Sequence, residues 1–110
     1  MRRCFVLDLK SDRDLIAAYE ARHAPGAVWP EVLRHIRQQG VIEMEIWRAA
    51  DRLVMLCEVS EDYPRPLPPH SRVVQWENEM LLYQKPLPAA SPDAKWLEMK
   101  RIFILPDTET

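Results

Sequence analysis

The chain has 110 residues, of which 47% are hydrophobic and 29% are charged, and this composition favours one globular domain over disorder. Its 15 basic and 17 acidic residues give a net charge of −2, so a nucleic-acid partner, which needs a basic face, is not expected. No apolar run approaches the roughly 20 residues of a membrane span, and Asp8 interrupts the first apolar stretch too early for a signal peptide. We therefore expect a cytoplasmic protein without a membrane partner. The 2 glycines exclude a Gly-rich phosphate loop.

The beginning of the chain predicts a strand and two helical segments. Residues 3–9 are largely apolar, which favours a strand. Ser11 has an acidic residue three positions later, a pattern typical of a helix start, and the helix is expected to extend to about residue 23. A Pro-Gly pair within residues 24–27 must interrupt it. Pro30 suits the first turn of a second helical segment, which Gly40 would end.

The middle of the chain predicts a β-hairpin followed by a loop. Apolar residues alternate with polar ones over residues 42–47, which favours a half-buried strand. Residues 53–59 are more continuously apolar and predict a second, more buried strand after a short turn. Prolines are frequent in residues 60–69, so this segment is expected to be a stiff loop.

The last third predicts one helix and one strand. Apolar residues at near-helical spacing favour a helix over about residues 70–84, and prolines make residues 85–95 a second long loop. Residues 96–105 are expected to form a strand that Pro106 ends. We therefore expect a single domain over residues 1–106 and a polar C-terminal tail over residues 107–110.

The order of these elements indicates an α+β fold. Strand, helix, strand, strand, helix, strand is the ferredoxin-like split β-α-β arrangement, a four-stranded antiparallel sheet with helices on one face. The other face of such a sheet needs cover, and a second copy of the chain would supply it in so small a protein. A homodimer is therefore predicted.

The cysteines and histidines give no metal motif. Cys4 and Cys57 lie far apart in apolar strands, which favours two reduced core thiols, with a disulfide between adjacent strands as the alternative. There is no Cys-x-x-Cys pattern, and only 3 histidines are present. His35 and His70 are expected to be exposed on the surface.

His23 and Tyr19 are the first candidates for chemistry. They are four residues apart on one predicted helix, so their side chains share a face. A histidine can take and give a proton near neutral pH, and a tyrosine hydroxyl can orient a substrate oxygen. The alternative is a structural histidine that interacts with the negative end of the helix.

The four tryptophans offer flat apolar walls on which the C–H face of a sugar could lie, although each can equally be a core residue. Trp76 is followed by Glu77, a possible hydrogen-bond acceptor. Glu43 and Glu45 share one strand face with Trp47; this face either is solvated, which we favour, or lines a polar pocket. No serine has the surroundings of an activated nucleophile. Acid–base chemistry by His23 without a cofactor, or simple ligand binding, remains.

Residues 19–23 (Tyr-Glu-Ala-Arg-His) and 29–31 (Trp-Pro-Glu) together resemble the signature of the L-rhamnose mutarotase family. The likeness extends through Gly40 and Trp76 to the closing residues 101–106. It implies a dimeric α+β barrel that interconverts the α and β anomers of a 6-deoxy sugar, with a monosaccharide as its partner molecule and neither a cofactor nor a metal.

The resemblance also implies roles for individual residues. His23 matches the proton donor of the family, and Tyr19 and Trp76 match its sugar-binding residues; Trp29 of the signature joins this set. Met44 stands where the family has a second binding tyrosine, and Glu77 where it has a second tryptophan. These departures, and the longer stretch between residues 23 and 29, look more like the L-fucose branch. L-fucose is therefore the favoured substrate and L-rhamnose the alternative.

Two different functions fit the same predicted fold. The first is a non-catalytic dimeric module that binds a small ligand or regulates a partner, since fold alone does not fix function. The second is a cofactor-free oxygenase of the same barrel class. Exchange between sugar anomers distinguishes the mutarotase from both.

Overall fold

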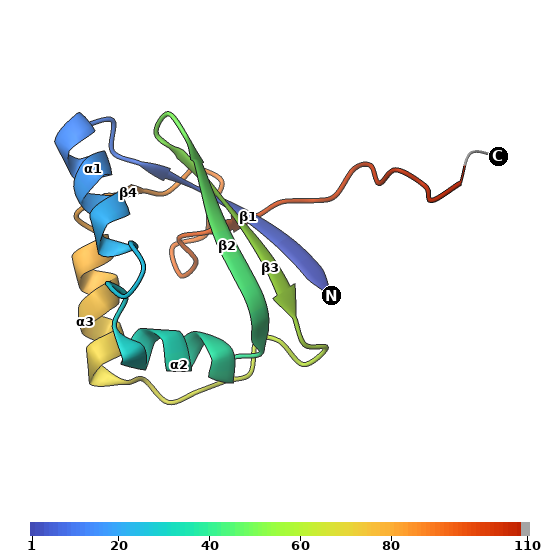
Figure 1. The fold of residues 1–110 in the computed structure, drawn as a ribbon, viewed down its shortest axis with the longest axis horizontal. Coiled ribbons are helices and arrows are strands. Elements are labelled where there is room, and N and C mark those ends of the chain that lie inside the picture. Colours follow the sequence, from blue (N-terminus) through green and yellow to red (C-terminus); the bar gives the residue numbers. More distant parts are fainter. Residues whose placement is uncertain (109–110) are drawn as a thin grey trace.

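A computed structural model describes residues 1–108 and has an α+β fold (Figure 1). Its strands and helices are β1 (Arg2–Leu9), α1 (Arg13–Arg22), α2 (Pro30–Gln38), β2 (Val41–Ala49), β3 (Arg52–Val59), α3 (Ser71–Met80), β4 (Gln84–Lys85) and β5 (Leu97–Glu98). The last two residues of the predicted C-terminal tail, 109 and 110, lie outside the described residues. None of the three helices of the described part is long and apolar enough to cross a membrane.

The sheet has the predicted ferredoxin-like order. All strand pairs are antiparallel, and the path through the sheet is β2-β3-β1-β4. The short strand β5 also pairs with β1, so that β4 and β5 occupy successive parts of the same edge of β1. The predicted four-stranded antiparallel sheet is thus confirmed, with its fourth position shared by two short strands.

The core lies between the sheet and the helices, because alternate strand residues point to that side. One cluster of buried side chains joins the ends of β1 and β3 to all three helices: Leu9, Tyr19, Val32, Leu53, Trp76 and Met80. A second cluster lies at the other end of the sheet: Phe5, Val41, Met55, Cys57 and Val59. The two cysteines are free. Cys4 lies opposite Leu56, the residue next to Cys57, so the two cysteine side chains point to opposite faces of the sheet, which excludes the alternative of a disulfide.

The helix boundaries follow local chemistry, with one correction at the first helix. Asp12, not Ser11, is the N-cap of α1, and its side chain accepts a hydrogen bond from the backbone N–H of Leu15 at 3.0 Å. Pro30 begins α2 as predicted. Gly40 follows the C-cap of α2 with φ +110°, and a Cβ at this position would collide with the hydroxyl of Ser60. Only glycine fits both requirements.

The third helix is shorter than predicted. It ends at Met80 rather than near residue 84, and the chain turns so that Gln84 can pair with Leu9 of β1. The helical spacing of apolar side chains continues past Met80, but pairing with the free edge of β1 satisfies the backbone there instead. Gln84 thereby enters the sheet next to the core.

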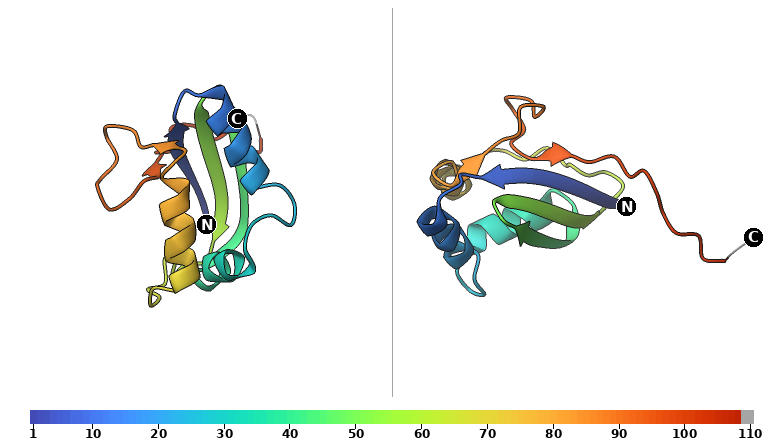
Figure 2. Two further views of the ribbon diagram at one scale, coloured as in Figure 1. Left: turned by 90° about the vertical axis from the view of Figure 1, so that its left-hand side faces the viewer. Right: turned by 90° about the horizontal axis from the view of Figure 1, so that it is seen from above.

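The prediction of a strand over residues 96–105 is mostly wrong. Only Leu97–Glu98 pair with β1, and the last backbone hydrogen bond to it runs from the N–H of Met99 to the carbonyl of Cys4 at 2.8 Å. Beyond this point the chain leaves the body of the molecule (Figures 1 and 2). We call residues 99–106 the C-terminal arm. It has no neighbouring strand within the described chain, and the Cα radius of gyration of 15.2 Å exceeds the about 13 Å of a compact domain of this length.

Candidate active site

A cleft between the helices and the sheet brings together most of the predicted site residues. It has a volume of about 360 Å³, and its lining includes Tyr19, His23, Met44, Trp76 and Glu77. A neighbouring groove of about 540 Å³ extends toward the edge of β2 and shares Tyr19, His23 and Met44 with it. We call the first cavity the helix–sheet cleft.

His23 is fixed in one tautomer by the helix that carries it. It is the C-cap of α1, and its Nδ1 lies 2.8 Å from the carbonyl oxygen of Tyr19. A carbonyl oxygen can only accept, so Nδ1 carries the proton of this hydrogen bond. In the neutral ring, Nε2 is therefore the unprotonated nitrogen that can accept a proton. Burial lowers the pKa of His23, with Arg22 adding to the effect and the hydrogen bond to Tyr19 opposing it, so the neutral form predominates at pH 7.

Tyr19 is the most deeply buried polar group on the same helix face. It is only 4% exposed, and its ring centroid lies 4.3 Å from that of His23. Burial raises the pKa of Tyr19 to about 12, an effect that the neighbouring Gln84 side chain opposes. The phenol therefore keeps its proton across the physiological range and can act as a hydrogen-bond donor.

Trp76 forms an aromatic wall beside His23. The two ring centroids are 5.6 Å apart, and the rings are nearly perpendicular. Trp29 supports Trp76 edge-on at 5.2 Å but is not among the residues that line the cleft. The guanidinium of Arg22 lies over Trp76 at 5.1 Å and forms an ion pair with Glu79. The tryptophan wall is thus held in place by charged and aromatic neighbours.

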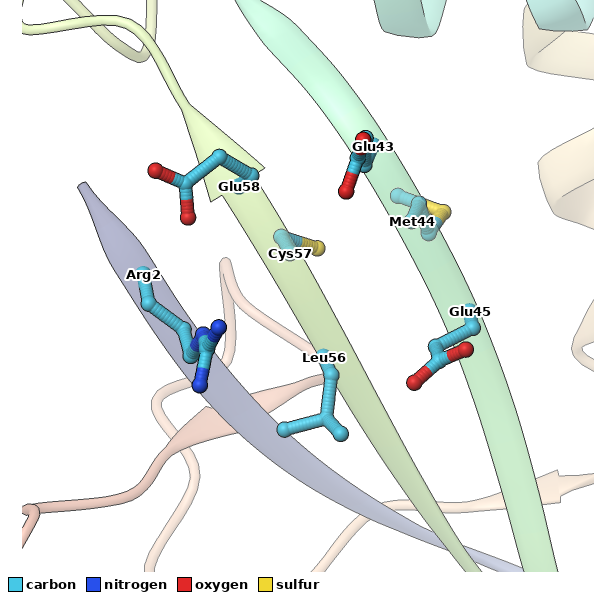
Figure 3. A pocket seen from close by; sticks show the side chains of 7 residues that line it. All are labelled: Arg2, Glu43, Met44, Glu45, Leu56, Cys57 and Glu58. Atoms are coloured by element: carbon cyan, nitrogen blue, oxygen red, sulfur yellow. The ribbon is translucent and has the colours of Figure 1, made fainter.

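Glu77 lies at the mouth of the cleft and is paired with Lys95, whose Nζ is 2.5 Å from Oε2. Met44 lies across from the helices on β2 and is 38% exposed. The two neighbouring glutamates, Glu43 and Glu45, line a second pocket together with Met44 itself, Arg2 and Glu58 (Figure 3). Glu45 and Trp47 also contribute to the groove at the edge of β2.

Several residues of the cleft were not predicted. His35, expected to be exposed, is half-buried and lines the cleft, because α2 turns it toward the sheet. Tyr63, Gln84 and Trp96 also line it. Tyr63 and Trp96 come from loops, whose path is not encoded in a periodic pattern. Gln84 follows an apolar run and precedes Lys85, and this pattern does not distinguish it from an ordinary surface residue.

The cleft thus brings together His23, the protonated phenol of Tyr19 and the wall formed by Trp76. Residues 2–105 match the family model described as L-rhamnose mutarotase. The matched range contains all of the cleft residues named above. The match defines the protein as a mutarotase, which is a carbohydrate isomerase. The chain belongs to the L-rhamnose mutarotase family.

Two relatives illustrate this membership. The chain is 47% identical over 109 residues to an L-fucose mutarotase of Xanthomonas campestris pv. campestris, a match that covers 94% of this chain and 87% of the relative. It is also similar to the crystal structure of L-rhamnose mutarotase from Formosa agariphila, with a TM-score of 0.69 and 24% identity over 96% of this chain and 99% of the other. The second likeness supports the fold.

Proposed function

We propose that the protein interconverts the α and β anomers of L-fucose in the helix–sheet cleft. The observation that carries the proposal is the arrangement of His23, with its free Nε2, beside Tyr19 and Trp76. The choice of L-fucose is supported by the 47% identity to an L-fucose mutarotase. Met44 and Glu77, which depart from the L-rhamnose pattern, both line the cleft and are consistent with a changed sugar preference.

Anomer exchange requires one proton to move between two oxygens of the sugar. As the C1–O5 bond breaks, the electron pair stays on the ring oxygen O5, which gains a proton, while the anomeric hydroxyl loses its proton and becomes the aldehyde oxygen. Both oxygens are attached to C1, so one nitrogen can reach both. We propose that Nε2 of neutral His23 takes the proton of the anomeric hydroxyl and donates it to O5. The aldehyde then rotates about C1–C2 and closes by the reverse steps.

The other cleft residues would hold the sugar during this exchange. In the proposal, the protonated phenol of Tyr19 donates a hydrogen bond to a sugar oxygen, and Trp76 packs against the apolar C–H face. Glu77 accepts a hydrogen bond from a sugar hydroxyl at the mouth of the cleft. Met44 provides apolar contact from β2, and Trp29 acts behind Trp76 by fixing its orientation.

Saturation-transfer NMR on the sugar anomers tests the proposal. We expect accelerated exchange for L-fucose and slower exchange for L-rhamnose, D-galactose and D-mannose at equal concentrations, each corrected for spontaneous mutarotation. Preferential acceleration of L-rhamnose would assign that sugar instead. Binding of the sugars without accelerated exchange of any of them would support a non-catalytic binding protein.

We further propose that the protein is a homodimer in which the C-terminal arm packs against a second copy. The arm carries consecutive apolar residues of very high exposure, from 64% for Ile104 to 91% for Ile102. So much apolar surface on an extended segment is unfavourable in water. The sheet face that lacks helices carries the partly buried side chains of Val54 and Leu56. A measured mass in solution of twice 13.0 kDa is the expected result, and a mass of 13.0 kDa at all concentrations would refute the dimer.

A further inference from the structure

Gln84 is an unusual residue for the interior of this protein. Among the polar and charged residues within 1–108, Gln84 is the one that is buried, with 6% of its surface exposed. It begins β4 and pairs with Leu9 of β1, which is itself part of the core cluster around Tyr19 and Trp76. An amide with two donor hydrogens and one acceptor oxygen is costly to bury unless each end has a partner.

The amide of Gln84 lies beside the phenol of Tyr19 and has one atom without a partner. The Gln84 side chain opposes the effect of burial on the pKa of Tyr19, as a neighbour that stabilises the tyrosinate does. Its Oε1 has no hydrogen-bond partner within the described part of the chain and is almost inaccessible to solvent. Gln84 also lines the helix–sheet cleft together with His23 and Trp76. The unpartnered acceptor therefore belongs to a residue on the wall of the cavity that takes the sugar.

We propose that Gln84 is a sugar-binding residue: its side-chain amide turns toward the cleft when the sugar binds, and its Oε1 then accepts a hydrogen bond from a ring hydroxyl of the substrate. This inference rests on the proposed function of the cleft. In the proposal the phenol oxygen of Tyr19 accepts from the amide N–H of Gln84, which leaves the phenol hydrogen free to donate to the sugar. Gln84 and Tyr19 then form one chain of hydrogen bonds that contacts the substrate at two oxygens.

Such a contact would select among 6-deoxy sugars. L-fucose and L-rhamnose differ in the orientation of their hydroxyls at C2 and C4, so a fixed acceptor that contacts either of these hydroxyls cannot meet both sugars equally well. A site built to pair a hydroxyl discriminates strongly against a substrate that lacks it, because the buried acceptor is left without a partner. Gln84 would thus be a determinant of sugar preference.

The test uses the full chain carrying Gln84→Met, which keeps the length of the side chain and removes its polar atoms. Anomer exchange is measured with L-fucose and with its 2-deoxy, 3-deoxy and 4-deoxy analogues. We expect the KM for L-fucose to rise about tenfold, the loss expected for one hydrogen bond. The same substitution should leave KM unchanged for the one deoxy sugar that lacks the contacted hydroxyl. Gln75→Met is the matched control, since Gln75 is exposed on α3 and bonded to Arg72 outside the cleft.

An unchanged KM in Gln84→Met, or an equal rise for L-fucose and every deoxy analogue, would overturn the proposal. If this variant does not fold, the side-chain amide signal of Gln84 in the ¹⁵N-labelled wild-type protein replaces it: L-fucose should shift this signal with a midpoint near KM, and an unmoved signal at saturation would refute the contact. Wild-type protein that exchanges no sugar would refute the proposed function itself, which is a separate outcome.

Discussion

The Nδ1 of His23 lies 2.8 Å from the carbonyl oxygen of Tyr19, one helical turn earlier on α1. This single contact places a proton on Nδ1, leaves Nε2 as the unprotonated nitrogen of the neutral ring, and accompanies the packing of the ring against the phenol of the same tyrosine. The structural role of a histidine at a helix end and a catalytic role are therefore compatible here. The structure shows the helix-end position of His23, and its catalytic role stays a prediction.

The pH dependence of exchange follows from the buried position of His23. Burial lowers its pKa below the ordinary 6.5, and the proposed step requires the neutral ring. We expect kcat/KM for L-fucose, which reports the free enzyme, to be constant at neutral pH and to fall on the acid side with a midpoint below 6.5. Saturation-transfer NMR measures the exchange rate at pH values from about 4.5 to about 8.5. A midpoint above 6.5 would contradict the assignment.

His23 also makes the free energy of unfolding depend on pH. Unfolding frees His23 to bind a proton near its ordinary pKa of 6.5, whereas the folded protein resists protonation. The unfolded state therefore binds more protons between the two pKa values, and the free energy of unfolding should decrease as the pH drops through this window. Urea unfolding at several pH values should show a smaller decrease for His23→Asn, which cannot titrate.

Tyr19→Phe tests the role of the hydroxyl group of Tyr19 separately from that of its aromatic ring. Phenylalanine keeps the packing of a residue that is 4% exposed but removes the hydroxyl. Loss of one hydrogen bond to the sugar predicts a fall in kcat/KM of about 3- to 10-fold with L-fucose. Because the pKa of Tyr19 is raised to about 12, the wild-type activity should show no alkaline limb near 10. Tyr83→Phe is the control, since Tyr83 packs against Tyr19 outside the cleft lining.

The two glycines should differ in their tolerance of a side chain. Gly26 and Gly40 both have positive φ, but a Cβ at Gly26 meets open space, whereas one at Gly40 collides with Ser60. Gly26→Ala should cost about 1 kcal/mol of unfolding free energy and Gly40→Ala about 2–3 kcal/mol. Urea denaturation of both variants measures the difference. Equal losses would mean that the close approach to Ser60 contributes nothing.

The C-terminal arm should determine the oligomeric state. A charge at Ile102, which is 91% exposed in the single chain, would be buried against the second copy in the proposed dimer. Ile102→Asp is therefore expected to weaken association at least 100-fold, the cost of leaving an unpaired charge in an interface. Sedimentation analysis across protein concentrations measures this. Asp107→Ala, beyond the apolar run, is the control, and a dimer unchanged by Ile102→Asp would exclude the arm from the interface.

The fold was predictable where local patterns determine structure. Alternation along β2 and the apolar run of β3 placed the hairpin, and Pro30 and Gly40 marked the ends of α2, because backbone geometry restricts which residues fit there. The strand predicted over residues 96–105 was wrong beyond Glu98, since a strand needs a partner edge and sequence periodicity carries no information on where that edge lies.

The candidate site was predictable in part for a similar reason. His23 and Tyr19 were found because helical spacing places them on one face. Trp76 and Glu77 were candidates as neighbours on a predicted helix, and the family resemblance then implied their roles. The cleft contains all four and Met44, while Trp29 lies behind the wall. Gln84 required the structure, because only the pairing of β4 with β1 brings it against Tyr19.

The most direct test of the account is the rate of L-fucose anomer exchange in His23→Asn. Asparagine keeps a polar side chain at the C-cap of α1 but cannot carry a proton between the two oxygens at C1. The account predicts a loss of about 10²- to 10⁴-fold in enzymatic exchange, with unchanged circular dichroism and retained sugar binding. His70→Asn, a surface cap of α3 that asparagine can also provide, should exchange L-fucose at the wild-type rate. Near-wild-type exchange in His23→Asn would contradict the account.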